Sequence, residues 1–423
     1  MDSRIQAFVD QAKTTFGLGN YYLHQHSLWR DVNHFNETSY TLCLEWFPNG
    51  TESDEDGSNP EGTAVIEYNV NTGKLKNAIF VMGETYAQDG ITFNGETEDV
   101  IKWIELETGL TYIEQFQIHN VTENEIECRA IIDGIPVSPA GYIEVKWNDN
   151  RELTFFSVHG EFPIGNQVLR ETYNLSLEEA KYIAKEQVKR LEYPSFEHKS
   201  LYAVYAVEEI YIRNKDLTTK PFEMFQDGGT SRKVNHILNW DEPISGGFFE
   251  RKEIDLQEEI TVDEAFSCTP SPTTLPITEE DEKKCVEAVE RLLRQEYPED
   301  SGIWRVTTLH RDKKFLVATL RTNQHETRVF ERKLSVFLDP HSMDVVNYID
   351  NQFMLEMYDS FEELGDVTVT QDEAYEKLKG LFELKSFYVY DDEEKQYILC
   401  GKLDCHHGVN AETGEVVLLN DLG

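Results

Sequence analysis

The side chains best suited to chemistry gather near the end of the chain, at Cys400, Cys405, His406 and His407. Thiolates and imidazoles are ligands that zinc prefers in proteins. Side chains on a strand alternate between its faces, so Cys405 and His407 would share one face while His406 would point away. Only a turn could bring Cys400 to them, and a further ligand would have to come from elsewhere. A buried cysteine beside surface histidines is more usual, so we expect no metal at Cys405 and His407.

A second pair of potential metal ligands, His24 and His26, lies near the start of the chain. Because they are two residues apart, both imidazoles would project from one face of a strand, and His34 could add a third ligand. The alternative is a polar strand face with the aromatic neighbours Tyr22 and Trp29. We expect this alternative, and therefore no metal at His24 or His26.

An acidic segment between two expected strands carries oxygen ligands of the kind that calcium prefers, at Asp54, Asp56, Asn59 and Glu61. Gly57 stands two places too early for an EF-hand loop. A solvated acidic loop therefore explains this segment better than a calcium site does.

Signatures of nucleophilic catalysis and of nucleotide binding are missing from the sequence. It contains no Gly-x-Ser-x-Gly motif, no phosphate-binding loop of the Gly-x4-Gly-Lys kind and no Gly-x-Gly-x-x-Gly motif. With 79 acidic residues in the chain, pairs of carboxylates do not single out a site. We therefore assign no catalytic residue and expect no cofactor.

These candidates must be positioned by a recurring pattern of one helix followed by several strands. Apolar residues at helical spacing predict the helices, and the capping boxes Ser176–Glu179 and Thr370–Glu373 mark two helix starts. The expected helices begin at residues 3, 97, 176, 278 and 370. Strands follow each of them, among them a long strand Leu201–Ile212 and the closing strands Gln396–Gly401 and Leu403–Val409.

The distance between successive helix starts predicts the size of the repeating unit. These distances are too long for a solenoid repeat and suit an α+β unit in which one helix packs on about four antiparallel strands. The expected units span residues 1–90, 91–170, 171–266, 277–365 and 366–423, and a proline-rich linker spans residues 267–276.

Several short strings in the sequence are similar to one family. Ile132–Val137 (IDGIPV) and Val409–Val416 (VNAETGEV) match its hairpins, while Leu175–Ala180 (LSLEEA), Val369–Ala374 (VTQDEA) and Ile260–Ala265 (ITVDEA) match its helix start. Together they resemble the YcdB/YcdC repeated-domain proteins of spore-forming bacteria. These proteins are a PepSY-related group of unassigned function.

The resemblance implies tandem PepSY-type, cystatin-like α+β units without a known catalytic residue. Some PepSY modules belong to the propeptides of secreted metallopeptidases or have been proposed as peptidase inhibitors. The implied class of function is therefore protein binding, including inhibition of a peptidase, and no active-site position is implied.

Charge limits the partners that the chain can take. The 39 Lys and Arg residues and 79 Asp and Glu residues leave a net charge of −40, which disfavours nucleic acid and anionic membranes and favours basic partners. No apolar run approaches the roughly 20 residues of a membrane span, and no signal peptide is visible. The six scattered cysteines are expected to be reduced thiols in a cytoplasmic protein.

Two classes of function remain. We expect a non-catalytic protein-binding or scaffold module whose partner carries a basic surface. The alternative is an enzyme or a metal-dependent binding protein whose site is assembled between units. A deep pocket that contains titratable groups with shifted pKa values would favour the alternative.

Overall fold

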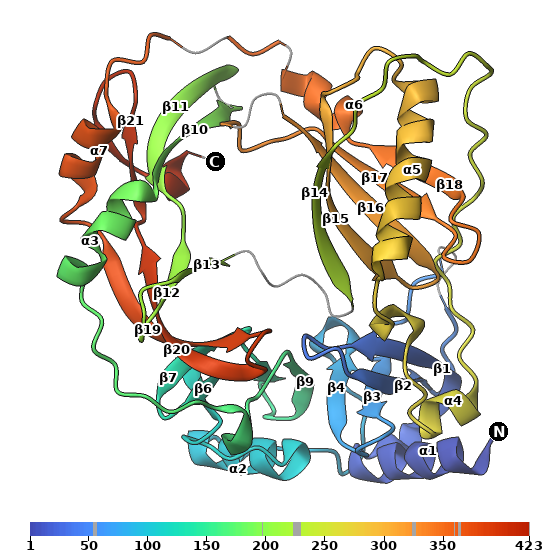
Figure 1. Ribbon diagram of the computed structural model, residues 1–423. Coiled ribbons are helices and arrows are strands. Elements are labelled where there is room, and N and C mark those ends of the chain that lie inside the picture. Colours follow the sequence, from blue (N-terminus) through green and yellow to red (C-terminus); the bar gives the residue numbers. More distant parts are fainter. Residues whose placement is uncertain are drawn as a thin grey trace.

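The computed structural model describes residues 1–53, 57–196, 198–222, 230–323, 327–358, 360–362 and 365–422. Asp54 and Asp56 of the acidic segment therefore lie outside the described residues. The chain is mixed α+β, with three sheets and few helices among the described residues (Figure 1). Antiparallel neighbours dominate these sheets, as the short turns predict.

The first two expected units share one continuous sheet. Its helices and strands are α1 (Ser3–Thr15), β1 (Tyr21–Val32), β2 (Thr38–Pro48), β3 (Ala64–Asn69), β4 (Leu75–Phe80), α2 (Thr97–Thr108), β5 (Phe116–Val121), β6 (Glu125–Ile132), β7 (Ile135–Ser138), β8 (Tyr142–Trp147) and β9 (Leu153–His159). β4 pairs with β9 across the expected boundary at residue 90, so the ladder runs from one unit into the next. We call these strands the first sheet.

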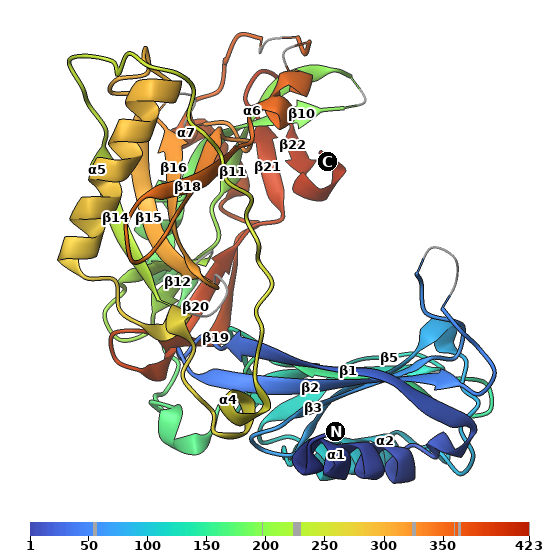
Figure 2. The ribbon, with the colours of Figure 1, turned by 90° about the vertical axis from the view of Figure 1, so that its right-hand side faces the viewer.

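Alternation of apolar and polar residues decides which face of the first sheet is covered. Residues such as Tyr68, Val145 and Phe156 are buried beneath α1 and α2, which supply Ile5 and Ile104 to the same core. Figure 2 shows both helices against this face, while the other face carries no helix and the rest of the molecule rises from one end of the sheet.

The third and fifth expected units exchange hairpins. Their elements are α3 (Leu177–Glu186), β10 (Val188–Ser195), β11 (Ser200–Val207), β12 (Ile210–Arg213), β13 (Thr219–Pro221), α7 (Gln371–Leu378), β19 (Glu383–Asp391), β20 (Gln396–Asp404), β21 (His407–Asn410) and β22 (Val416–Leu418). The expected long strand Leu201–Ile212 breaks between β11 and β12. β11 then pairs with β21 of the fifth unit, and β12 pairs with β20.

The exchange produces two composite sheets. One has the order β10-β11-β21-β22, and in the other β20 lies between β19 and β12. β19 also pairs in parallel with β7, which extends the first sheet into a sheet of 13 strands among the described residues. α3 and α7 pack on a shared core that includes Ala184, Leu378 and Val409.

The fourth expected unit is larger than predicted. It consists of β14 (Ser231–Ile237), α5 (Glu279–Glu296), β15 (Trp304–Asp312), β16 (Phe315–Thr322), β17 (Lys333–Leu338) and β18 (Val345–Asp350), followed by the short helix α6 (Gln352–Leu355). Its first strand, β14, comes from the range expected for the third unit. The helix start expected at Ile260–Ala265 forms only α4 (Val262–Phe266), which places Ala265 in the core of the first sheet.

The α+β class is therefore confirmed, and the prediction of simple four-stranded units is wrong. The sheets are large because strand edges that a single unit would expose are paired with strands of another unit. An unpaired edge presents free N–H and C=O groups, so pairing it with a neighbouring unit stabilises both. No helix in the described ranges is long and apolar enough to cross a membrane.

All six cysteines are free, and their environments predict how they react. Cys268 is exposed, whereas the others are buried, and burial raises the pKa of the Cys43 and Cys128 thiols to about 12. We expect one thiol to react rapidly with a thiol reagent in the native protein and all six to react after denaturation without reductant. A denatured count near four or lower would show disulfides and contradict the structure.

Candidate functional site

The uncovered face of the first sheet carries an acidic patch made of two rows that cross the strands. One row pairs Cys43, Glu67, Asn77, Ser157, Glu144 and Glu127, and the adjacent row pairs Glu45, Val65, Ile79, Phe155, Lys146 and Glu125. Five glutamates thus accompany one lysine. We call this surface the acidic face.

Contacts between neighbouring side chains hold the acidic face in place. The Asn77 amide donates to Glu67 at 2.5 Å. The Lys146 ammonium lies 2.6 Å from the Glu144 carboxylate and 3.0 Å from that of Glu125, and it also lies 5.6 Å from the centre of the Phe155 ring. One lysine partly neutralises two glutamates, so Glu45, Glu67 and Glu127 leave a local excess of negative charge.

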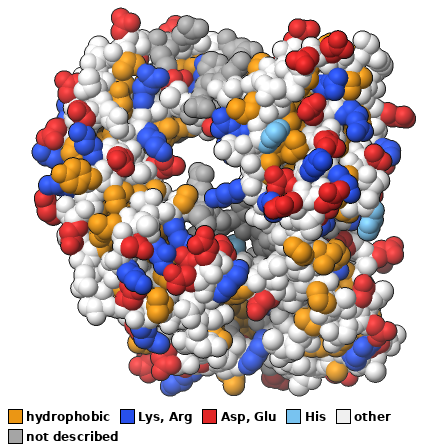
Figure 3. All heavy atoms as spheres, in the orientation of Figure 1, with side chains coloured by type: hydrophobic (Ala, Val, Ile, Leu, Met, Phe, Trp, Pro, Cys, Tyr) orange, Lys and Arg blue, Asp and Glu red, His pale blue; other side chains and the backbone are white. Residues whose placement is uncertain are grey.

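A cleft of about 820 Å³ lies where the first sheet meets the fourth unit, and we call it the corner cleft. The first sheet contributes the ends of β1, β4 and β9, the fourth unit contributes the turn between β15 and β16, and the expected linker contributes Ser271 and Thr273. Arg30, Lys76 and Lys313 are among the basic residues in its lining. Figure 3 shows the molecule hollowed at the centre of this view, between the lobe of the exchanged hairpins and the fourth unit.

Glu161 is a titratable residue of the corner cleft whose pKa lies far from its ordinary value. Burial, against a lowering by the hydrogen bond from the His34 backbone and with a small contribution from Glu37, raises its pKa to about 7. The carboxyl group can therefore gain or lose a proton near neutral pH. Glu161 also acts electrostatically on Tyr397, whose buried hydroxyl has no hydrogen-bond partner within the described part of the chain.

Two basic groups of the corner cleft, those of Arg30 and Lys76, are engaged by neighbouring groups. The Arg30 guanidinium lies 2.5 Å from the Glu258 carboxylate. Lys76 donates to the Thr41 hydroxyl at 2.9 Å and lies 3.4 Å from Asp31. The Arg30 contact fastens the segment around Glu258 to the first sheet, whereas the Lys76 contacts join strands within that sheet.

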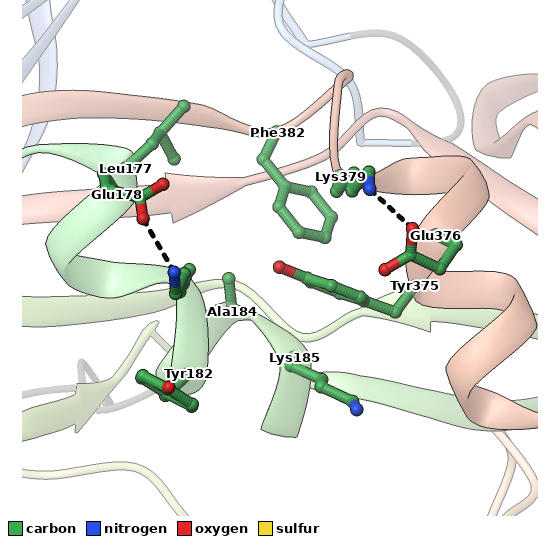
Figure 4. A pocket seen from close by; sticks show the side chains of 10 residues that line it. Leu177, Glu178, Tyr182, Ala184, Lys185, Tyr375, Glu376, Lys379 and Phe382 are labelled. Atoms are coloured by element: carbon green, nitrogen blue, oxygen red, sulfur yellow. Dashed lines mark hydrogen bonds and ion pairs between the residues drawn. The ribbon is translucent and has the colours of Figure 1, made fainter.

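A second groove, of about 530 Å³, separates α3 and α7 (Figure 4). Tyr182 and Lys185 of α3 lie on one side of it, and Tyr375 and Lys379 of α7 lie on the other. Its lysines are paired with carboxylates, as Lys185 of α3 is with Asp372 of α7 at 2.9 Å. Since the charges are already compensated, the groove offers less to a charged partner than the acidic face does.

Contrary to the prediction from their spacing, the two histidines near the start of the chain do not share one strand face. A β-bulge between Leu23 and Gln25 interrupts the alternation of β1. His24 stacks on Phe47 with ring centres 4.0 Å apart, whereas His26 lies opposite Leu44, a residue of the helix-covered core. The bulge therefore separates the imidazoles of His24 and His26.

The cysteines near the end of the chain are parts of hydrophobic cores. Cys405 lies in the break between β20 and β21, and its thiol donates to the backbone carbonyl of His407 at 3.4 Å rather than to the imidazole. Burial raises the pKa of the Cys405 thiol. Cys400 packs in a different cluster, with Tyr211. Within the described residues, no group of three or more His, Cys, Asp or Glu side chains could hold a metal ion.

The acidic face and Glu161 were both missed by reasoning from the sequence. Glu125 and Glu127 stand at alternate positions of β6, and this spacing is a signal that could have predicted an acidic strand face. No comparable signal marks Glu161, because its burial depends on segments far away in the sequence.

Comparisons with known proteins leave the family open. No family model matches the chain, and no curated protein matches it. Among solved structures, the Bacillus megaterium YpeB C-terminal domain is similar at a TM-score of 0.24 and 10% sequence identity, over 82% of this chain and 96% of that one. A likeness this weak carries no argument about function, and membership of the YcdB/YcdC family stays a prediction.

Proposed function

We propose that the protein is a non-catalytic binding module that holds a basic segment of another protein on the acidic face. The observation that supports this most strongly is the excess of glutamates on a sheet face that carries no helix. Exposed sheet faces with aromatic neighbours such as Phe155 offer apolar contact beside the charges. A peptidase with a basic surface would be such a partner, in keeping with the inhibitor class.

Electrostatics predicts how such a partner would bind. Complementary charge speeds association and is screened over about 8 Å at physiological salt. The association rate of a basic segment should therefore fall as salt rises, while its dissociation rate changes little. Duplex DNA and anionic vesicles should not bind, because the net charge of −40 repels them.

A charge-neutralising variant tests the acidic face. Glu67→Gln, Glu127→Gln and Glu144→Gln together should slow association of a synthetic Lys/Arg-rich peptide about tenfold in a stopped-flow or surface-binding measurement. The matched control, Glu279→Gln with Glu280→Gln and Glu287→Gln on exposed positions of α5, removes the same charge elsewhere and should change the rate less than about twofold. Equal effects of the two variants on the association rate, or an association rate that does not depend on salt concentration, would overturn the proposal.

We keep the cytoplasmic location as part of this proposal. Six free thiols, five of them buried, are typical of a protein that folds in a reducing compartment.

A second candidate function, an enzyme with its site between units, is favoured by Glu161 in the corner cleft. A carboxyl group with a pKa of about 7 is suited to general acid–base catalysis at neutral pH. A panel of chromogenic ester, glycoside and phosphoester substrates tests this candidate. Turnover that rises through pH 7 and is lost in Glu161→Gln would support it, whereas turnover that survives in the variant would assign the chemistry elsewhere.

A further inference from the structure

A cluster of exposed apolar side chains lies at the junction between the third and fourth units. Phe353, Met354 and Met357 are 70%, 57% and 53% exposed, and Phe196 is 55% exposed. Phe353 and Met357 are four residues apart, and both belong to the short helical segment formed by α6 and the turn Glu356–Tyr358, so they lie on one face of it. We call these four residues the Met/Phe patch.

An aromatic layer supports the Met/Phe patch. Tyr358 stacks on Phe330 with ring centres 4.1 Å apart and meets Phe361 edge to face at 5.3 Å. Phe196 joins this layer through Tyr358 and Phe361, each with ring centres 5.8 Å away. Phe196 and Tyr358, the residue that follows Met357, therefore belong to one packed aromatic layer.

Backbone hydrogen bonds fix the same junction. The N–H of Glu192 donates to the Thr327 carbonyl at 2.7 Å, and the N–H of Val329 donates to the Glu192 carbonyl at 3.1 Å. The N–H of Leu201 donates to the Glu362 carbonyl, and the N–H of Glu362 donates to the Lys199 carbonyl, both at 2.9 Å. These bonds occupy the free edge of β10 at Glu192, so a partner cannot add a strand there.

The Met/Phe patch differs from the other exposed apolar residues. Met82 and Leu106, at 80% and 73% exposure, are single residues on separate elements, which is ordinary for a protein surface. Three large exposed apolar side chains on one short helical segment, joined to Phe196 through the Tyr358 ring, mark an interaction surface more often than chance exposure does. Methionine is flexible and polarisable, and it suits surfaces that adapt to a partner helix.

Charge around the patch indicates the kind of partner. Among the described residues of the segment 350–366, four are Asp or Glu and none is Lys or Arg. Glu356, Glu362 and Asp366 are exposed in this segment. An apolar centre with an acidic rim is complementary to a helix that has apolar residues on one face and Lys or Arg on its flanks.

We propose that the Met/Phe patch binds a basic amphipathic helix of a partner protein. The apolar face of that helix covers Phe353, Met357 and Phe196, and its lysines or arginines lie over Glu356 and Glu362. The patch is separate from the acidic face of the first sheet, so this inference goes beyond the function proposed above and does not depend on it.

Two peptides of one composition test the proposal. The first is an 18-residue Leu/Lys peptide with leucines at helical spacing, and the second has the same residues in alternating order, so it has equal charge but no apolar helix face. Fluorescence anisotropy should show that the wild-type protein binds the first at least about tenfold more tightly than the second. Equal affinity for both peptides would overturn the proposal, because charge alone would then explain binding.

Variants locate the binding surface. Phe353→Ser with Met357→Ser should remove the preference for the first peptide, while the matched control, Met82→Ser with Leu106→Ser, should leave it unchanged. The variant that neutralises the acidic face should bind both peptides more weakly by the same factor, and it should keep the preference for the first peptide. The proposal would be overturned if the glutamine variant of the acidic face lost the preference while Phe353→Ser with Met357→Ser kept it. The acidic-face proposal would then still stand.

A second copy of the chain is the competing occupant. Sedimentation velocity over a hundredfold range of protein concentration should show a monomer that does not change with Phe353→Ser and Met357→Ser. A wild-type dimer that these substitutions dissociate would show that the patch is covered by another copy of this chain, and the proposal would be wrong.

Discussion

Replacing Gly408 with valine is expected to lower the free energy of unfolding by about 2–3 kcal/mol. A Cβ at position 408 would collide with Val204 of β11 and would lie 2.9 Å from Leu419 and 3.2 Å from the Tyr205 carbonyl oxygen. The close approach exists because β21 of the fifth unit pairs with β11 of the third. Urea unfolding measures the loss, and hydrogen exchange should show faster exchange in β10, β11, β21 and β22 together.

The control for this prediction is Gly380→Ala. A Cβ at Gly380 meets nothing within 4 Å, so this variant should unfold within about 0.5 kcal/mol of the parent. If Gly408→Val loosened β21 and β22 but left β10 and β11 protected, the hairpins would not be exchanged. The pairing of the third and fifth units would then be refuted.

Substituting glutamine for Glu161 is expected to stabilise the protein, and more strongly as pH rises. Burial raises the pKa of this carboxyl from 4.5 to about 7 in the folded chain. Ionisation therefore opposes folding, and stability falls as the pH rises from 4.5 to 7 and stays reduced above it. Glutamine never ionises, so the variant should be more stable than the parent by about 1–3 kcal/mol at pH 8.

The pH dependence separates this effect from a simple gain in packing. Urea unfolding between pH 5.5 and 8.5 stays above the isoelectric point of about 4.6 and should show the advantage of Glu161→Gln growing by about 1–2 kcal/mol. The control is Glu123→Gln, at an exposed position of the β5–β6 turn. Its free energy of unfolding should change with pH in the same way as that of the parent. An advantage that does not change with pH would mean that the half-buried site of Glu161 does not raise its pKa.

Local features of the fold could be predicted from the sequence because they depend on neighbouring residues. The capping boxes at Ser176 and Thr370 begin α3 and α7, in which the hydroxyl and the glutamate satisfy free N–H groups. The helix expected to begin at residue 278 is α5, whose buried face carries Cys285 and Leu292. The bulge at His24 was missed, since one extra residue in a strand leaves no clear mark in a pattern of alternation.

The candidate sites depended on contacts between distant parts of the chain. The sequence by itself determined the helix starts, the alternation of the strands, the free cysteines and the strong negative charge, all of which follow from residue type and short spacing. The tertiary structure decided that β4 pairs with β9, that β11 pairs with β21 and that Glu161 is half-buried in the corner cleft. Strand edges can pair with many partners of similar pattern, so only burial across the whole molecule selects one pairing and shifts one pKa.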